Sequence, residues 1–204
     1  MTKGLHKNWG GILMMGGRAQ RMGGLDKGTL QLRGRSFKKI AISRLETTFH
    51  KVAVSTGSKP NTDINGVQFT DVTIQGDLIG PVGGLLSALE WADSLGLWGI
   101  LTLPVDTPIL PDNLCEALLA SGGPSYASHG SQSHWLHAVW PLSFAADIRR
   151  HVFENQVFSL HRLHRIIGST PVKFPIGNDG AFKNINTAND LKALQKASKN
   201  VPTI

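Results

Sequence analysis

The chain of 204 residues lacks several features that define common classes of protein. Its single cysteine, Cys115, excludes an internal disulfide framework and is expected in the core. No stretch approaches the roughly eighteen apolar residues of a membrane span, and the first residues contain no apolar segment typical of a secretory signal. These absences favour a protein of the reducing cytoplasm that has no membrane partner.

Acidic residues are also scarce, because 14 Asp and Glu stand against 21 Lys and Arg, which gives a formal net charge of +7. Such an excess favours anionic partners, namely nucleotides, phosphorylated cofactors or nucleic acids. However, the basic residues are dispersed, aromatic residues make up only 7% of the chain, and no RNP, zinc-finger or helix-turn-helix pattern occurs. We therefore expect no nucleic-acid partner.

Three widespread motifs of nucleotide binding and catalysis are missing. A P-loop requires Gly-Lys followed by Ser or Thr, whereas Lys27 follows Asp26 and precedes Gly28. The dinucleotide pattern G-x-G-x-x-G and the nucleophile elbow G-x-S-x-G are absent as well. A protein without its own nucleophile suits a reaction in which a substrate phosphate or hydroxyl attacks, and the protein supplies positioning and charge neutralisation.

The most informative segment that is present runs from Gly10 to Lys27, with the sequence GGILMMGGRAQRMGGLDK. Its continuous apolar run at 12–15 predicts a strand buried on both faces of a parallel sheet. Gly16 and Gly17 then end the strand in a loop whose backbone amides can surround an anion. The segment therefore predicts a phosphate-binding loop.

Three cations in the same loop, Arg18, Arg21 and Lys27, strengthen this interpretation. The alternative is a solvated turn that carries surface charges, which is the default for a single pair of glycines. Four glycines, three cations and an acid directly after a buried strand favour the functional interpretation.

The remaining chain alternates short apolar runs with helical patterns. We expect strands at 10–15, 51–55, 98–103, 125–127, 136–140 and 171–174, and helices at 36–48, 83–94, 111–120, 143–154, 158–166 and 187–197. This order predicts one α/β domain over residues 1–204, with a three-layer Rossmann-like fold, a mostly parallel central sheet, and ligands at the carboxyl ends of its strands. Residues 1–8 and 198–204 are expected to be flexible ends, and Thr187 with Asp190 predicts a capping box for the last helix.

Two carboxylates follow predicted strands. Asp106 lies in the segment LPVDTP, where two prolines restrict the backbone beside a buried strand. A hard carboxylate opposite a phosphate loop is what a Mg²⁺ site requires, although Asp106 as the cap of the helix near Pro111 is the alternative. Asp71 follows a further expected strand at 67–70 and gives a weaker signal, since such a residue alone is more often part of a turn. The small residues at 80–84 open a helix whose amide end can face an anion.

The histidines permit two interpretations. His129, His134 and His137 are close in sequence, and His161 and His164 are three residues apart, as metal ligands sometimes are. No Glu or Cys completes a usual zinc arrangement, so a surface that carries histidines is favoured over a metal site.

The motifs MMGGRAQRMGGLDKG, LPVDTPILP and FKNINTANDL (182–191) together resemble the molybdenum cofactor guanylyltransferase family across nearly the whole chain. The resemblance implies a nucleotidyltransferase fold, GTP and Mg²⁺, and transfer of GMP to the terminal phosphate of molybdopterin with release of pyrophosphate. It also implies partners among cofactor-delivery proteins and molybdoenzymes.

Carried over by position, the resemblance assigns nucleotide binding to Met14, Met15, Gly16, Gly17, Lys27, Ser55, Asp71 and Asp106. Among these, Lys27 and Asp106 would act in catalysis together with Arg21, and Asp106 would coordinate Mg²⁺. Asn184 and Asn186 would line the pterin side of the cleft.

The chain departs from the family pattern at Ser55, where an asparagine is often found, and at Trp135, where a proline often follows the histidine. Two other functions stay open. The same chemistry with CTP is one, because a loop that contacts bases through its backbone distinguishes triphosphates poorly. A non-catalytic nucleotide-binding or cofactor-delivery protein is the other, and the presence of both Lys27 and Asp106 argues against it.

Overall fold

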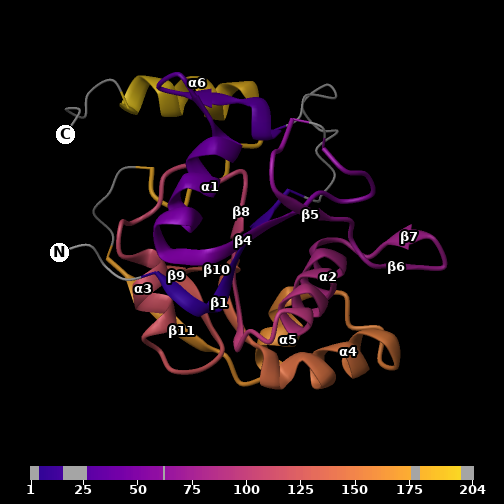
Figure 1. Ribbon diagram of the computed structural model, residues 1–204. Helices are drawn as coiled ribbons and strands as arrows, with labels where there is room; N and C mark the ends of the chain where they lie inside the picture. Colours follow the sequence, from indigo (N-terminus) through magenta and orange to yellow (C-terminus); the bar gives the residue numbers. More distant parts are fainter. Residues whose placement is uncertain (1–4, 16–26, 62, 176–179, 199–204) are drawn as a thin grey trace.

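The computed structural model describes residues 5–15, 27–61, 63–175 and 180–198, and these form one large sheet with helices on both faces (Figure 1). The sheet contains β1 (His6–Met14), β4 (Phe49–Ser55), β5 (Val67–Phe69), β8 (Gly99–Pro104), β9 (Ser125–His129), β10 (Gln132–Pro141) and β11 (Thr170–Phe174). The helices are α1 (Phe37–Thr48), α2 (Pro81–Ser94), α3 (Leu114–Leu119), α4 (Ala145–Phe153), α5 (Leu160–Ile166) and α6 (Ala188–Ser198). Two small hairpins, β2 (Gln31–Leu32) with β3 (Arg35–Ser36) and β6 (Thr73–Ile74) with β7 (Asp77–Leu78), and two 3₁₀ turns at Lys27–Thr29 and Leu142–Phe144 complete the described elements.

The seven strands are ordered β11-β9-β10-β8-β1-β4-β5. Strand β1 pairs in parallel with β4 and β8, and the pairs β4/β5 and β9/β11 are parallel too. Only β10 among the described strands of this sheet runs antiparallel to its neighbours β8 and β9. The prediction of a mostly parallel sheet is therefore confirmed, with one reversed strand that the sequence did not indicate.

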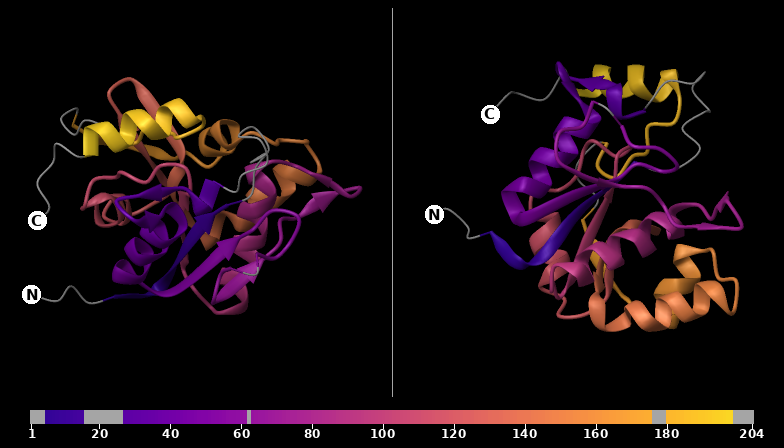
Figure 2. Two further views of the ribbon diagram at one scale, coloured as in Figure 1. Left: turned by 90° about the horizontal axis from the view of Figure 1, so that it is seen from above. Right: turned by 45° about the vertical axis from the view of Figure 1, so that its right-hand side comes forward.

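Helices α1, α3 and α6 cover one face of the sheet, and α2, α4 and α5 cover the other (Figure 2). Each face has its own apolar core, and successive residues of β1 alternate between the two: Ile12 packs with the α2 side and Leu13 with the α1 side, both fully buried. This confirms the strand buried on both faces that was predicted from its continuous apolar run. Cys115 is also buried, as expected.

Helix α2 brings its first turn unusually close to the sheet. Pro81 fixes the first helical residue after Gly80, whose φ of 66° suits glycine. Two glycines follow, and a Cβ added there would lie 2.4 Å from the Val72 carbonyl oxygen at Gly83 and 2.5 Å from the Ser55 hydroxyl at Gly84. The small residues therefore let the amino end of α2 approach the carboxyl end of β4.

Several boundaries differ from the sequence prediction. Strand β1 begins at His6, inside the segment 1–8 that was expected to be flexible, because its first residues still pair with β4. Helix α3 begins at Leu114 rather than near Pro111, since residues 112 and 113 form a turn. Neither small hairpin was predicted. No helix in the described part of the chain is long and apolar enough to cross a membrane.

Candidate active site

A cavity of about 950 Å³ opens where β1 and β8 end. Three groups of residues line it. The first, called the strand-end wall here, consists of Met14, Met15, Lys27, Gly80, Pro81, Pro104, Val105 and Asp106. The second is the pair Asn184 and Asn186, and the third, called the bulge wall, consists of residues 133–137 of β10 and residues 158–161 at the start of α5.

The strand-end wall is held by hydrogen bonds between neighbouring strand ends. The backbone N–H of Met15 donates to the carbonyl oxygen of Ser55 at 2.8 Å, and that of Val105 donates to the carbonyl of Met14 at 3.2 Å. The ends of β1, β4 and β8 therefore form one rigid edge, as expected for a parallel sheet whose ligands bind at the carboxyl ends.

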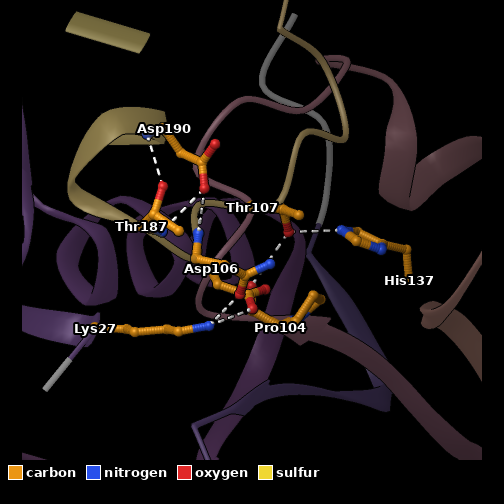
Figure 3. A network of polar contacts seen from close by, with 8 residues as sticks. Lys27, Pro104, Asp106, Thr107, His137, Thr187 and Asp190 are labelled. Atoms are coloured by element: carbon orange, nitrogen blue, oxygen red, sulfur yellow. Dashed lines mark hydrogen bonds and ion pairs between the residues drawn. The ribbon is translucent and has the colours of Figure 1, made fainter. Parts of the chain in front are cut away.

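Lys27 and Asp106 form an ion pair in this wall, with 3.1 Å between Nζ and Oδ2 (Figure 3). The lysine also donates to Oδ1 of Asn186 at 2.5 Å, and the N–H of Ile185 donates to the carbonyl of Asp106 at 2.8 Å. These contacts join three segments that are far apart in sequence. The alternative that Asp106 caps the next helix is wrong, because the N-cap of α3 is Asn113.

Asn186 is positioned by the start of α6. Oδ2 of Asp190 accepts hydrogen bonds from the N–H groups of Asn186 at 3.1 Å and Thr187 at 2.9 Å, and the Thr187 hydroxyl oxygen accepts from the Asp190 N–H at 3.1 Å (Figure 3). Hydrogen bonding by Thr187 and Asn186 lowers the pKa of the Asp190 carboxyl. The predicted capping box is thus confirmed, and it fixes the backbone next to the cavity.

Asp106 has the chemistry of a ligand for a hard divalent cation. Its carboxylate is 21% exposed and already faces one cation, the Lys27 ammonium. The described residues contain no group of three His, Cys, Asp or Glu side chains able to hold a metal ion. A cation at Asp106 would therefore need most of its ligands from water and from a bound anion, which is the usual arrangement for Mg²⁺ with nucleotides.

Ser55 and Asp71 lie together but do not line the cavity. The Ser55 hydroxyl donates to Oδ1 of Asp71 at 2.5 Å, and the N–H of Gly57 donates to the same oxygen at 3.3 Å. Burial raises the pKa of the Asp71 carboxyl, which is only 8% exposed. These contacts join the ends of β4 and β5 below α2, so a direct contact with nucleotide stays a prediction for both residues. Gly16, Gly17, Arg18 and Arg21 lie outside the described residues.

Two histidines, His137 in the bulge wall and His164 of α5, are core residues. The His137 ring is 2% exposed with Nε2 2.8 Å from the Thr107 hydroxyl, and burial lowers its pKa to about 3. His164 is 1% exposed, and burial lowers its pKa to about 4. The Nε2–H of His164 donates to the carbonyl of Trp135 at 2.9 Å, so its Nδ1 accepts from the Ser169 hydroxyl at 2.8 Å. The preferred interpretation of surface histidines is therefore wrong for both.

The metal interpretation gains no support either. His129, His134 and His137 pack around the Phe182 ring, with ring centroids 4.6 to 5.4 Å from it, rather than around a common point. The sequence did not indicate Phe158 and Leu160 in the bulge wall at all. No local pattern could have done so, because the start of an amphipathic helix shows the same residues whether or not it borders a cavity.

Comparison with known proteins identifies the family of the chain. Residues 11–169 match the family model of the MobA-like NTP transferase domain. A molybdenum cofactor guanylyltransferase of Acidiphilium cryptum is 32% identical over 186 residues, which cover 90% of this chain and 92% of that protein.

Solved structures agree on the fold. The molybdopterin-guanine dinucleotide biosynthesis protein A of Archaeoglobus fulgidus superimposes with a TM-score of 0.69 at 16% identity, covering 94% of this chain and 100% of that one. A Mycobacterium tuberculosis protein solved in complex with manganese superimposes with a TM-score of 0.63 at 13% identity, covering 93% and 98% of the two chains. The predicted Rossmann-like nucleotidyltransferase fold is confirmed, and the chain belongs to the MobA-like NTP transferase family.

Proposed function

We propose that this nucleotidyltransferase transfers GMP from GTP to the terminal phosphate of molybdopterin and releases pyrophosphate. The observation that carries the proposal is the convergence of Lys27, Asp106 and Asn186, three residues that the resemblance assigns to this reaction, at one point of one cavity. The relative from Acidiphilium cryptum, a molybdenum cofactor guanylyltransferase, supports it.

In the reaction, an oxygen of the terminal phosphate of molybdopterin attacks the α-phosphorus of GTP. The new P–O bond forms as the bond between the α-phosphorus and the pyrophosphate oxygen breaks, and the electron pair leaves with pyrophosphate. No protein nucleophile is needed, which agrees with the absence of a nucleophile elbow from the sequence. The protein has to align the two phosphates and offset their negative charge.

The strand-end wall has the groups for this task. Lys27 supplies one positive charge, and the amino end of α2 borders the cavity at Gly80 and Pro81, which brings the positive end of the helix dipole close to a bound anion. Met14 and Met15 would lie along the guanine and the ribose, and Asn184 with Asn186 would line the acceptor side. Arg21 would add a further cation to the phosphate site.

The ion pair between Lys27 and Asp106 should change when a nucleotide binds. A triphosphate carries more negative charge than one carboxylate, so it competes with Asp106 for the Lys27 ammonium. Asp106 is then the carboxylate that would hold Mg²⁺, which supplies positive charge beside the phosphate oxygens when bound. The location of this reaction in the cytoplasm, with cofactor-delivery proteins and molybdoenzymes as partners, stays a prediction.

The decisive experiment is to incubate the protein with molybdopterin and Mg²⁺ and with GTP, CTP or ATP separately, and to identify the product by mass. We expect the guanine dinucleotide with GTP and little product with the others. Formation of the cytosine dinucleotide would instead assign a cytidylyltransferase. Tight binding of GTP without any product would assign a nucleotide-binding or cofactor-delivery protein.

A further inference from the structure

The bulge wall owes its shape to an irregularity in β10. His134 pairs with Ala127 of β9, but the next pair joins Ala138 to Tyr126. Strand β10 thus advances four residues while β9 advances one, so Trp135, Leu136 and His137 lie outside the regular ladder. All three line the cavity, and bulges of this kind turn side chains toward functional sites.

Contacts from a helix, a strand and a loop hold the bulge in place. The His164 ring of α5 donates to the carbonyl of Trp135, and the Thr102 hydroxyl of β8 donates to the carbonyl of Leu136 at 2.7 Å. The ring of His137 is held by Thr107, directly after Asp106. With the carbonyls of Trp135 and Leu136 and the ring of His137 each bonded to a side chain, the bulge is a fixed surface rather than a loose loop.

The surface that the bulge presents is aromatic. The Trp135 indole packs in a tilted arrangement against Tyr126 and His161, with ring centroids 4.5 Å and 4.8 Å away. His161 lines the cavity beside it, as does Phe158, which remains 39% exposed. Such a grouping of partly exposed rings in a cavity of a basic protein provides a stacking surface for a flat ligand.

Two polar atoms of the bulge wall lack partners among the described residues. Within the part of the chain that the structure describes, Nε2 of His134 and Nδ1 of His137 are buried and have no hydrogen-bond partner. Both residues line the cavity, and the His137 side chain is almost completely buried. Buried polar atoms usually have partners, so these two indicate a ligand that brings hydrogen-bonding groups along its edge.

We infer that the bulge wall binds the planar heteroaromatic ring system of the acceptor substrate, with the Trp135 indole as its stacking surface and His134 and His137 at the polar edge of the ring. This inference rests on the proposed function. The described residues proposed to contact the nucleotide in this cavity lie on the strand-end wall, which leaves the bulge wall to the acceptor. Asn184 and Asn186, beside Lys27, then hold the acceptor near its reacting phosphate.

The test compares Trp135→Leu, Trp135→Phe and the control Trp98→Leu, because Trp98 is 64% exposed and does not line the cavity. The probe is free pterin, which carries the ring without a phosphate, and its dissociation constant is measured by calorimetry. We expect Trp135→Leu to weaken pterin binding about tenfold, as the loss of an aromatic pair implies, and Trp135→Phe to keep most of it. Trp98→Leu should bind pterin like the wild type.

The same variants are assayed for GTP binding and for transfer to molybdopterin. Trp135→Leu should raise the KM for molybdopterin and leave the GTP dissociation constant and kcat unchanged. Equal pterin binding in all four proteins overturns the inference, and so does a Trp135→Leu variant that loses GTP affinity instead, since the wall would then bind the nucleotide base. If the wild type binds pterin through Trp135 but transfers no nucleotide, the proposed function fails while the ring site stands.

Discussion

The two walls of the cavity are built in different ways. The strand-end wall follows from the topology of a parallel sheet, in which β1, β4 and β8 all end at the same edge and their next residues must meet there. The bulge wall follows from an irregular stretch of β10, which is the reversed strand, and from the helix α5 that packs behind it. One wall follows from the architecture, and the other depends on particular side chains.

This difference separates the chemistry from the selection of the acceptor. A phosphate site needs charge and backbone amides at a fixed edge, which any chain with this topology can supply. Recognition of a particular ring needs side chains of specific shape, which an irregular strand can present without disturbing the edge. Variants of the two walls should therefore have separable effects.

The largest effect is expected in the strand-end wall, from Asp106→Ala. Loss of the proposed metal ligand should lower kcat for GMP transfer on the order of 10³-fold, because the missing charge matters most in the transition state. GTP affinity and the melting temperature should change little, since the Asp106 carboxylate faces the cavity and its Lys27 partner becomes available to the triphosphate. Steady-state kinetics and thermal melting measure both quantities.

Asp112→Ala is the matched control for this variant. Asp112 belongs to the same loop but is fully exposed, and its nearest cation is Arg44 at 3.7 Å. It should keep wild-type kinetics. An Asp106→Ala enzyme that melts several degrees lower but still transfers GMP at a near wild-type rate would show that Asp106 has a structural role only.

The strand-end wall was the part of the site that the sequence could predict. Met14, Met15, Lys27 and Asp106 each lie in or after a segment with a strong pattern, a buried apolar run or a proline-restricted turn, and the structure places all four in one cavity. The pattern of short apolar runs also placed Ser55 and Asp71 correctly at strand ends. It did not reveal that the two side chains satisfy each other below α2 rather than facing the cavity.

The second prediction concerns Lys27→Ala. Because charge-assisted hydrogen bonds contribute about 1.5–3 kcal/mol, the loss of this cation should weaken GTP binding roughly tenfold or more. Lys39→Ala, which removes an exposed lysine of α1, should bind GTP normally. Calorimetric titration measures the GTP dissociation constants of both variants. If folded Lys27→Ala binds GTP as tightly as the wild type does, Lys27 has only a structural role in this turn.

A third variant, Asp71→Ala, tests whether a strand-end carboxylate serves the nucleotide or the fold. Its removal leaves the Ser55 hydroxyl and the Gly57 N–H without their acceptor, which should cost about 1–3 kcal/mol of unfolding free energy. GTP affinity should stay close to that of the wild type. Asp77→Ala, on the exposed β6/β7 hairpin, is the control for stability. A folded Asp71→Ala protein with much weaker GTP binding would place Asp71 in the nucleotide site after all.

The bulge wall could not have been predicted from local patterns. The run from His134 to Ala138 has the composition of an ordinary strand, and its register with β9 depends on contacts with Thr102, Thr107 and His164 from distant segments. Sequence periodicity contains no information on such contacts, so it favours surface positions for histidines that are in fact buried. Only the folded structure shows that they support the wall.

The last predicted effect is a pH dependence that arises in the bulge wall. Burial lowers the pKa of His137 to about 3 and that of His164 to about 4, both from an ordinary value of 6.5. Below pH 6.5 the unfolded chain therefore binds protons that the folded protein does not. The stability associated with the neutral rings is complete above pH 6.5 and is lost as the pH falls toward these lower values.

Between pH 6.5 and 5.5, each of the two histidines should lower the free energy of unfolding by about 1 kcal/mol. Urea denaturation at both pH values measures this loss, and His164→Gln should remove about half of the contribution because the amide does not titrate. His50→Gln, which changes an exposed histidine of β4, should leave the pH dependence intact. Asp71, whose raised pKa acts in the opposite direction, is common to all three proteins and cancels in the comparison. Because both rings stay neutral in the folded protein at pH 5.5, the carbonyl of Trp135 keeps its donor on His164, and pterin binding should not weaken across this step. Weaker pterin binding at pH 5.5 would mean that the bulge wall opens before the protein unfolds.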